Sequence, residues 1–183
     1  MLGSMPGKRN IYLIGPMGSG KTAVGKELAR DLGLEFLDSD LEIEKRTGVD
    51  IPYIFEKEGE DGFRSREATV IADLCKLEGV VVATGGGAVL SEQSRKQLAA
   101  TGVVIYLKTE VEEQLKRTRR APNRPLLANG NRRETLERLA EIRAPLYAEI
   151  ADISVDTSGK RVRAVAAALV GLVGKHGFMP LQK

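Results

Sequence analysis

An eight-residue run near the N-terminus places the strongest constraint on how this chain can fold. It reads Gly15-Pro16-Met17-Gly18-Ser19-Gly20-Lys21-Thr22 and matches G-x-x-x-x-G-K-[ST] at every fixed position. An apolar stretch, residues 11–14, precedes it, and a helix-like pattern, residues 21–32, follows it. In this order of strand, loop and helix, backbone N–H groups and a helix N-terminus face a bound anion. The run therefore predicts a phosphate-binding loop rather than a glycine-rich turn.

The side chains of the run narrow the ligand to a nucleoside triphosphate bound with Mg²⁺. Lys21 is placed to neutralise charge on the β- and γ-phosphates, and the hydroxyl of Thr22 is a suitable Mg²⁺ ligand. We expect the nucleotide to be held by the end of the loop and the first helical turn: Gly18, Ser19, Gly20, Lys21, Thr22 and Ala23. By itself the run leaves kinases, GTPases, ATP-driven motors and switches open.

Strand-like and helix-like patterns alternate along the chain. Short apolar runs predict five strands, at residues 11–14, 35–37, 80–83, 103–107 and 153–155. Helical patterns lie between and after them, at residues 21–32, 40–46, 63–77, 92–100, 111–118, 134–150 and 163–173. Such alternation implies right-handed crossovers and a parallel sheet with helices on both faces. Since the chain has 183 residues, we predict one three-layer α/β/α domain spanning residues 1–183.

Composition excludes several classes of protein. The longest apolar runs, residues 80–90 and 164–174, are shorter than the roughly 18 residues that a membrane helix needs. Trp is absent and only 4% of residues are aromatic, which disfavours a nucleic-acid binder that stacks bases on aromatic rings. The single Cys75 cannot form an intramolecular disulfide and suits a reducing compartment. We expect a cytoplasmic protein that binds neither membranes nor nucleic acids.

Two carboxylates follow the second expected strand, in Asp38-Ser39-Asp40. This is the edge of the sheet where the phosphate loop lies and where ligands bind in open α/β folds. One interpretation is local, because Ser39 with Glu42 forms a capping box that starts a helix. The other is chemical, because a hydroxyl acceptor needs a carboxylate to orient it and a kinase needs an acid near Mg²⁺. Two acids can supply both roles.

Further candidates are three glycines and three arginines. Gly85, Gly86 and Gly87 follow the third strand and leave room for a ligand to touch backbone amides. Arg64, Arg124 and Arg143 each read singly as solvated arginines whose stems cover the surface. We expect Arg64 and Arg143 to lack acidic partners one helical turn away, which leaves both free to bind an anionic ligand.

A basic loop forms residues 119–133. It combines two prolines, three asparagines, one glycine and five arginines, with little apolar content. We expect such a segment not to bury itself against the core and to be mobile without ligand.

These motifs together resemble the shikimate kinase family. The resemblance rests on the phosphate loop, Asp38-Ser39-Asp40, Gly59-Glu60 followed by Phe63-Arg64 and Glu67, Gly85-Gly86-Gly87, Arg124-Pro125-Leu126-Leu127, and Arg143-x-Pro145-Leu146-Tyr147. It covers residues 10–174, nearly the whole chain. Several separated motifs in register are far more specific than a phosphate loop alone.

The resemblance implies a nucleoside-monophosphate-kinase-like P-loop fold with strand order 2-3-1-4-5. The insert at residues 40–78 then binds the acceptor, and residues 119–133 form a mobile lid. The implied reaction moves the γ-phosphate of ATP to the 3-hydroxyl of shikimate. The resemblance does not explain the tail, residues 176–183, which we expect to be disordered.

The resemblance also implies roles for single residues. Asp40, Arg64, Gly86 and Arg143, with Gly85 and Gly87 beside them, bind shikimate, and the two arginines hold its carboxylate in charge-assisted bonds. Arg117, Arg124 and the loop 157–162 bind ATP, with Arg117 and Lys160 near the adenine or ribose. Lys160 stands where many relatives have arginine. Asp38 contacts Mg²⁺, because the third strand ends in Thr84 and glycines without the usual acid. The catalytic residues are Lys21, Asp40 and Arg124, and Asp40 orients the attacking hydroxyl.

Two other functions remain open from the sequence. Another small-molecule kinase of this fold, acting on gluconate or a nucleoside monophosphate, also uses arginines that converge on an acceptor. A nucleotide-dependent switch or nucleic-acid-binding NTPase could use the basic patch at residues 116–133, which has seven basic residues and no acid. We favour small-molecule substrates and a monomer.

Overall fold

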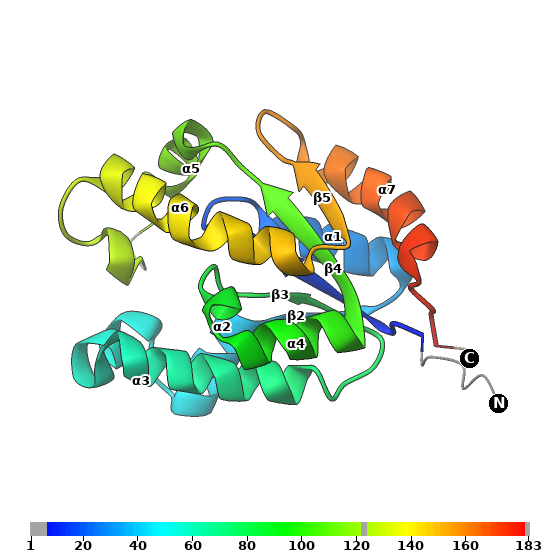
Figure 1. Ribbon diagram of the computed structural model, residues 1–183, viewed down its shortest axis with the longest axis horizontal. Helices are drawn as coiled ribbons and strands as arrows, with labels where there is room; N and C mark the ends of the chain where they lie inside the picture. Colours follow the sequence, from blue (N-terminus) through cyan, green and yellow to red (C-terminus); the bar gives the residue numbers. More distant parts are fainter. Residues whose placement is uncertain (1–6, 122–123, 182–183) are drawn as a thin grey trace.

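The computed structural model describes residues 7–121 and 124–181, and a five-stranded sheet runs through its centre. The strands are β1 (Asn10–Ile14), β2 (Glu35–Asp38), β3 (Val80–Ala83), β4 (Gly102–Lys108) and β5 (Ile153–Asp156). Their order is β2-β3-β1-β4-β5, and every neighbouring pair is parallel (Figure 1). The expected strand order is therefore confirmed.

Helices cover both faces of this sheet. They are α1 (Lys21–Leu32), α2 (Ser39–Thr47), α3 (Ile51–Leu74), α4 (Glu92–Thr101), α5 (Val111–Thr118), α6 (Arg132–Ile150) and α7 (Val162–Val173). Three short 3₁₀ turns accompany them: η1 (Ala88–Leu90), η2 (Pro125–Leu127) and η3 (Gly174–His176). In Figure 1, α3, α4 and α6 lie on one side of the sheet, and α1 and α7 lie on the other. The three-layer α/β/α architecture is confirmed.

The central strand shows why the strand sequences are continuously apolar. All of Ile11, Tyr12, Leu13 and Ile14 are fully buried. Ile11 and Leu13 pack in the core cluster of α1 and α7, whereas Tyr12 and Ile14 pack in the cluster of α3, α4 and α6. Successive side chains of a strand point to opposite faces, so a strand covered on both faces needs apolar residues throughout.

The insert after β2 is more helical than its sequence indicates. Helix α3 begins at Ile51 rather than at the expected residue 63, and Gly59 breaks its helical geometry with φ +70°. Residues 51–62 are rich in acids and glycine, so their helical pattern is weak. The overlooked signal is the cap: Asp50 accepts a hydrogen bond from the N–H of Tyr53 at 2.9 Å, and Pro52 lies in the first turn.

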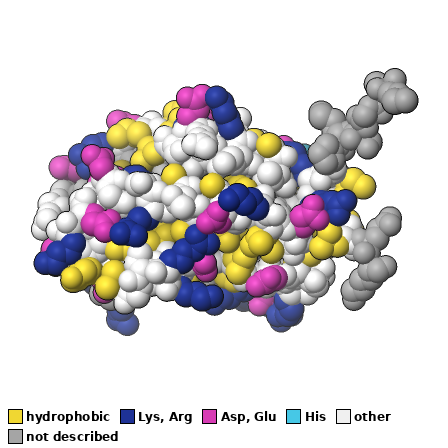
Figure 2. All heavy atoms as spheres, turned by 90° about the horizontal axis from the view of Figure 1, so that it is seen from below, with side chains coloured by type: hydrophobic (Ala, Val, Ile, Leu, Met, Phe, Trp, Pro, Cys, Tyr) yellow, Lys and Arg dark blue, Asp and Glu magenta, His cyan; other side chains and the backbone are white. Residues whose placement is uncertain are grey.

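Helices α2 and α3 also neutralise the acid-rich part of the sequence. Arg46 in α2 pairs with Asp73 in α3 at 2.7 Å, and within α3 Arg66 pairs with Glu58, also at 2.7 Å. Figure 2, which views the molecule from the side of α3, shows basic and acidic side chains interspersed over this face. The local clustering of acids in the sequence therefore does not produce an acidic face here.

The C-terminal tail is docked, so the expectation of disorder is wrong for residues 176–181. His176 ends η3, and the backbone of Phe178 forms a parallel bridge with Lys8. The N–H of Met179 donates to the carbonyl of Lys8 at 2.9 Å. The physical reason is apolar burial: Phe178 is only 9% exposed and joins the core cluster of α1 and α7. Residues 182–183 lie outside the described part.

The basic loop is likewise partly packed, against expectation. Leu127 in η2 is 6% exposed, and η2 contacts both α3 and α6. The two adjacent leucines in the loop give it an apolar anchor that a count of charged residues conceals. Residues 122–123, which belong to the expected lid, lie outside the described residues.

Within the described residues, no helix has both the length and the apolar composition required to span a membrane.

Candidate active site

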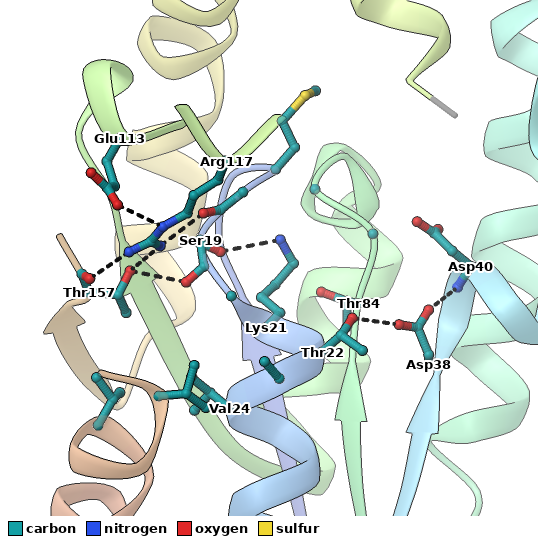
Figure 3. Close-up of a pocket in the computed structure, with 18 of the residues that line it drawn as sticks. Ser19, Lys21, Thr22, Val24, Asp38, Asp40, Thr84, Glu113, Arg117 and Thr157 are labelled. Atoms are coloured by element: carbon teal, nitrogen blue, oxygen red, sulfur yellow. Dashed lines mark hydrogen bonds and ion pairs between the residues drawn. The ribbon is translucent and has the colours of Figure 1, made fainter. Parts of the chain in front are cut away.

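A cleft of about 890 Å³ opens at the carboxyl ends of the strands, where the loops after β1, β2, β3 and β5 meet. Figure 3 shows the side chains that line it, with Lys21 and Thr22 from α1 at its centre. Most of the predicted site residues contribute to its wall: Gly18, Ser19, Gly20, Lys21, Thr22, Ala23, Asp38, Asp40, Gly85, Gly86, Arg117, Arg124 and Lys160. The remaining three, Arg64, Gly87 and Arg143, line an adjoining pocket.

The amine of Lys21 folds back over the phosphate loop. Its Nζ donates to the carbonyl oxygens of Gly15 at 2.6 Å and Pro16 at 2.9 Å. Burial lowers the pKa of Lys21 to about 7, with Asp40 opposing this shift and Arg124 adding to it. A polyphosphate beside this amine supplies the negative charge that favours its protonated form.

Thr22 and Asp38 meet beside the loop. The hydroxyl of Thr22 donates to Oδ2 of Asp38 at 2.9 Å. The other oxygen, Oδ1, caps α2 by accepting from the N–H groups of Asp40 at 3.0 Å and Leu41 at 3.2 Å. The cap of α2 is therefore Asp38, and the interpretation of Ser39 as the cap is wrong. Ser39 is fully buried and accepts from the N–H of Gly85 at 3.0 Å.

The pair of Thr22 and Asp38 suits Mg²⁺. Both are oxygen ligands, which this cation prefers, and they lie next to the loop that faces phosphate. The described residues contain no group of three or more His, Cys, Asp or Glu side chains that could hold a metal. Mg²⁺ needs few protein ligands when substrate phosphates and water complete its octahedral coordination.

Burial leaves a carboxylate oxygen of Asp40 without a partner at this edge of the sheet. Its Oδ1 atom is buried without a hydrogen-bond partner, as is Oε2 of Glu67. Both oxygens border Gly85, where a Cβ would lie 2.7 Å from the Asp40 oxygen and 2.6 Å from the Glu67 oxygen, so only glycine fits. Burial, together with the charges of Glu67 and Asp38, raises the pKa of Asp40 to about 6.

Arg64 is held by two acids, so the expectation that it lacks acidic partners is wrong. Its Nη1 donates to Glu67 at 2.7 Å and its Nη2 donates to Glu60 at 3.2 Å. The sequence signal was present, because Glu60 and Glu67 lie one turn before and one turn after Arg64 in α3. The guanidinium lies directly against Gly87, whose missing side chain leaves it space.

Arg143, unlike Arg64, forms no ion pair with an acid among the described residues. It is 4% exposed, and its Nε has no hydrogen-bond partner. Burial lowers the pKa of Arg143. Its neighbour Tyr147 donates its hydroxyl to the carbonyl of Gly86 at 2.5 Å and thereby fixes the turn after β3. A buried guanidinium without a carboxylate is costly, and an anionic ligand removes that cost.

Arg64 and Arg143 share a small pocket with Asp40 and the three glycines. Its volume is about 70 Å³, well below the roughly 300–1,000 Å³ typical of small-molecule sites. The segment 124–126 forms part of its wall, together with Phe55 and Phe63 of α3. Asp40 and Arg124 line both this pocket and the large cleft, so they stand at the junction of the two.

At the other end of the cleft, Arg117 ties the phosphate loop to the loop after β5. Its Nη1 donates to the carbonyl of Gly18 at 3.0 Å, and its Nη2 donates to the carbonyl of Thr157 at 2.9 Å. Lys160, in the same loop as Thr157, is exposed at the rim of the cleft. In the sequence, Glu67 belongs to one of the family motifs and Thr157 to the loop expected to bind ATP. Neither residue was predicted to have a role of its own.

Comparison with known proteins gives a consistent result. The family model described as shikimate kinase matches residues 17–173. A shikimate kinase of Vibrio cholerae is 52% identical over 172 residues, which cover 94% of this chain and 99% of that protein. The solved structure of an Acinetobacter baumannii shikimate kinase in complex with shikimate superimposes with a TM-score of 0.90 at 49% identity, covering 93% of this chain and 96% of that one. A gluconokinase from Sinorhizobium meliloti, at 16% identity and a TM-score of 0.63, shares the fold alone.

The raised pKa of Asp40 predicts that Asp40→Asn stabilises the protein at neutral pH. An acid with a folded-state pKa near 6, against an ordinary 3.8, binds its proton more tightly when folded, so its ionisation lowers stability as pH rises from about 4 to 6. In the absence of ligands, the variant should gain about 3 kcal/mol in free energy of unfolding at pH 7 and little at pH 4. Urea denaturation at both pH values measures this.

Asp61→Asn, at an exposed position of α3, is the matched control and should change the free energy of unfolding little at either pH. An Asp40→Asn protein that is less stable than the parent at pH 7, or equally stabilised at both pH values, would contradict the prediction.

Proposed function

Since the chain belongs to the shikimate kinase family, we propose a division of labour among its residues in the transfer of the γ-phosphate of ATP to shikimate. The protein is an ATP-dependent kinase, and its products are ADP and shikimate 3-phosphate. One observation supports this assignment of roles above the others. The acceptor pocket pairs a buried guanidinium that lacks an acid, Arg143, with a buried carboxylate oxygen that lacks a donor, on Asp40. A molecule with a carboxylate at one end and hydroxyls at the other satisfies both.

Arg143 and Arg64 bind the carboxylate of shikimate, in unequal ways. Arg143 has no other acid, so the ligand provides its counter-charge. Arg64 is oriented in advance by Glu60 and Glu67, which fix its guanidinium before the ligand arrives. A charge-assisted pair of this kind is shorter and stronger than a neutral hydrogen bond. Gly85, Gly86 and Gly87 keep the pocket free of side chains.

Asp40 orients the attacking hydroxyl and accepts its proton. Its pKa of about 6 lies close enough to neutral pH for the carboxylate to be ionised and still basic. Phosphoryl transfer passes through a loose transition state, so the main contribution of Asp40 is to position the hydroxyl in line with the γ-phosphate. Its place at the junction of cleft and pocket supports this role.

The nucleotide occupies the large cleft, with its phosphates on the loop from Gly18 to Thr22. Lys21 exchanges its contacts with the loop carbonyls for contacts with the β- and γ-phosphates. Thr22 and Asp38 hold Mg²⁺, which neutralises charge on the phosphate oxygens when bound. Arg117 and Lys160 border the base and ribose, and the guanidinium of Arg117 is held by protein carbonyls so that its flat face is free to stack.

The segment 119–133 acts as a lid over the acceptor. In its present position residues 124–126 help to reduce the acceptor pocket to about 70 Å³, so a substrate needs the segment to move aside. After closure, Arg124 lies between pocket and cleft, where its guanidinium stabilises charge on the transferring phosphoryl group. Closure also excludes water, which prevents hydrolysis of ATP.

We further propose that residues 1–183 act as one domain, with the acceptor site built largely by the insert at residues 40–78. We also propose that the protein acts as a monomer. The lone Cys75 is buried and free, which is consistent with a reducing compartment such as the cytoplasm.

ADP release measured by a coupled assay tests the acceptor. With shikimate, gluconate and nucleoside monophosphates offered separately, shikimate alone should stimulate ADP release above the background without acceptor. Release that ignores shikimate, or that is faster with gluconate or with a nucleoside monophosphate, would reject this function in favour of another small-molecule kinase of the same fold.

Arg143→Gln should weaken shikimate binding while leaving ATP binding intact. Losing the partner of a desolvated carboxylate costs at least about 2 kcal/mol, which corresponds to a rise of roughly 30-fold in KM for shikimate. Steady-state kinetics with each substrate varied in turn measures the two KM values. Arg138→Gln, on an exposed position of the same helix α6, is the control and should behave as the parent. An unchanged KM for shikimate in Arg143→Gln would refute the carboxylate contact.

Arg124→Ala should lower turnover by about 10³-fold, by analogy with arginine fingers, and change ATP affinity much less. The matched control is Arg120→Ala, an exposed arginine of the same segment, which should retain turnover. Trypsin should cut residues 119–133 in the free protein and spare them when ADP and shikimate are both bound. Normal turnover in Arg124→Ala, or equal cleavage in both states, would show that the segment is not a catalytic lid.

A further inference from the structure

The hydroxyl of Thr157 lies where three segments of the nucleotide site meet. Thr157 directly follows β5 and is 3% exposed. Its Oγ1 is 3.0 Å from the carbonyl oxygen of Ser19 in the phosphate loop and 2.7 Å from Oγ1 of Thr109 after β4. It is also 3.3 Å from Nη1 of Arg117 in α5. Figure 3 shows Thr157, Arg117 and Ser19 gathered on the opposite side of Lys21 from Asp38.

One assignment of protons satisfies these three contacts together. A hydroxyl donates one hydrogen bond and accepts up to two. Arg117 is only a donor, and the carbonyl of Ser19 is only an acceptor, so Thr157 accepts from Arg117 and donates to Ser19. The hydroxyl of Thr109 is then the second donor to Thr157. The carbonyl of Lys108, 3.2 Å away, already accepts from the backbone N–H of Thr157 at 2.9 Å and does not need this proton.

The bond to Ser19 fixes the direction of a backbone amide in the phosphate loop. The peptide between Ser19 and Gly20 is planar and trans, so its N–H points away from its C=O. Because the carbonyl is turned toward Thr157, the N–H of Gly20 is turned away from Thr157, and both Ser19 and Gly20 line the cleft. Gly20 is the N-cap of α1, so this N–H belongs to the helix N-terminus that faces the phosphates.

The preceding carbonyl is held from the same side. Arg117 donates to Gly18 through Nη1 and to the backbone carbonyl of Thr157 through Nη2, and Glu113 accepts from its Nε at 3.0 Å. Two successive carbonyls of the phosphate loop are thus tied to the segment that borders the nucleoside. The protein's own side chains therefore hold these two carbonyls in place.

We propose that Thr157 is a positioning residue for phosphoryl transfer, whose hydroxyl keeps the N–H of Gly20 directed at the nucleotide phosphates. Thr157 acts through Ser19 and does not itself touch the base. The inference rests on the proposed function, because it assigns the phosphates of ATP to this loop.

The experiment compares Thr157→Val, which removes the hydroxyl and keeps the shape, with Thr157→Ser, which keeps the hydroxyl. The probe is inorganic tripolyphosphate, which has the phosphate chain and no base, measured by its displacement of a fluorescent ADP analogue. In Thr157→Val, the Ki of tripolyphosphate and the KM for ATP should both rise about tenfold, the value of one lost hydrogen bond. Thr157→Ser should stay close to the parent, and KM for shikimate should change in neither variant.

Thr101→Val is the matched control for a loss of stability alone. Thr101 also bonds through its hydroxyl, to Tyr12 at 2.7 Å, but at the end of α4 and away from the cleft. Loss of the Thr101 hydroxyl should lower the melting temperature and leave the Ki of tripolyphosphate unchanged. If Thr157→Val does not fold, Thr157→Ala removes the same hydroxyl with a smaller side chain and carries the same expectation.

Three outcomes would overturn the proposal. An unchanged Ki of tripolyphosphate in Thr157→Val, even with a raised KM for ATP, would mean that Thr157 serves the nucleoside rather than the loop. Equal loss in Thr157→Ser would assign the effect to the methyl group, and equal loss in Thr101→Val would assign it to stability. Because displacement by tripolyphosphate needs no acceptor, a parent enzyme that ignores shikimate would defeat the proposed function without deciding this result.

Discussion

The ion pair between Glu67 and Arg64 is the interaction on which the acceptor site depends. Glu67 is 3% exposed, and a carboxylate at that depth is tolerated only with a cation close by, here Arg64 at 2.7 Å. The pair pins the guanidinium against Gly87, inside the pocket. The second oxygen of Glu67 faces Asp40 across Gly85, and its charge contributes to the raised pKa of Asp40. One buried acid thus fixes the position of Arg64 and raises the pKa of Asp40, the two residues proposed to bind the carboxylate of shikimate and to orient its hydroxyl.

The described structure concentrates its unsatisfied polar atoms in this one place. Four buried side-chain atoms have no hydrogen-bond partner, and three of them belong to Asp40, Glu67 and Arg143 in the acceptor pocket. The fourth, Nε of Arg95, lies 2.9 Å from a carboxylate oxygen of Glu149 and so has an ionic partner. Polar groups of this kind reduce the stability of the free protein. The proposed acceptor, shikimate, has a carboxylate and hydroxyls that match these groups.

The parallel fold and the phosphate loop follow directly from the sequence, because continuous apolar strands and a glycine-rich run have few alternative structures. The strand order and most of the acceptor-site residues were predicted from the resemblance to the shikimate kinase family, since no local pattern specifies which strands are neighbours. The tail was misjudged because the burial of Phe178 against α1 and α7 is a long-range contact. The prediction for Arg64 is wrong for a different reason: Glu60 and Glu67 are local, four residues before and three residues after Arg64, and this helical spacing was overlooked.

The sequence placed Thr157 in a loop expected to bind ATP, but it did not indicate the contact with the phosphate loop. Its importance comes from a hydroxyl that reaches Ser19 across 138 positions of the chain. Such a contact depends on the side-by-side placement of β1, β4 and β5, which only the folded sheet establishes. For Arg143, the lack of a nearby acid on its own helix was predicted from the sequence, but its burial to 4% exposure depends on the folded neighbours.

Asp40 and Arg124 stand in a wall that the nucleotide cleft and the acceptor pocket have in common. On the proposed assignment, ATP and shikimate lie on the two sides of this wall, which gives a route for electrostatic coupling between their binding equilibria. Linkage requires that coupling to be reciprocal: whatever factor ATP contributes to the affinity for shikimate, shikimate contributes to the affinity for ATP. On the proposed assignment, the shared wall is the place where an effect of one substrate on the binding of the other would be transmitted.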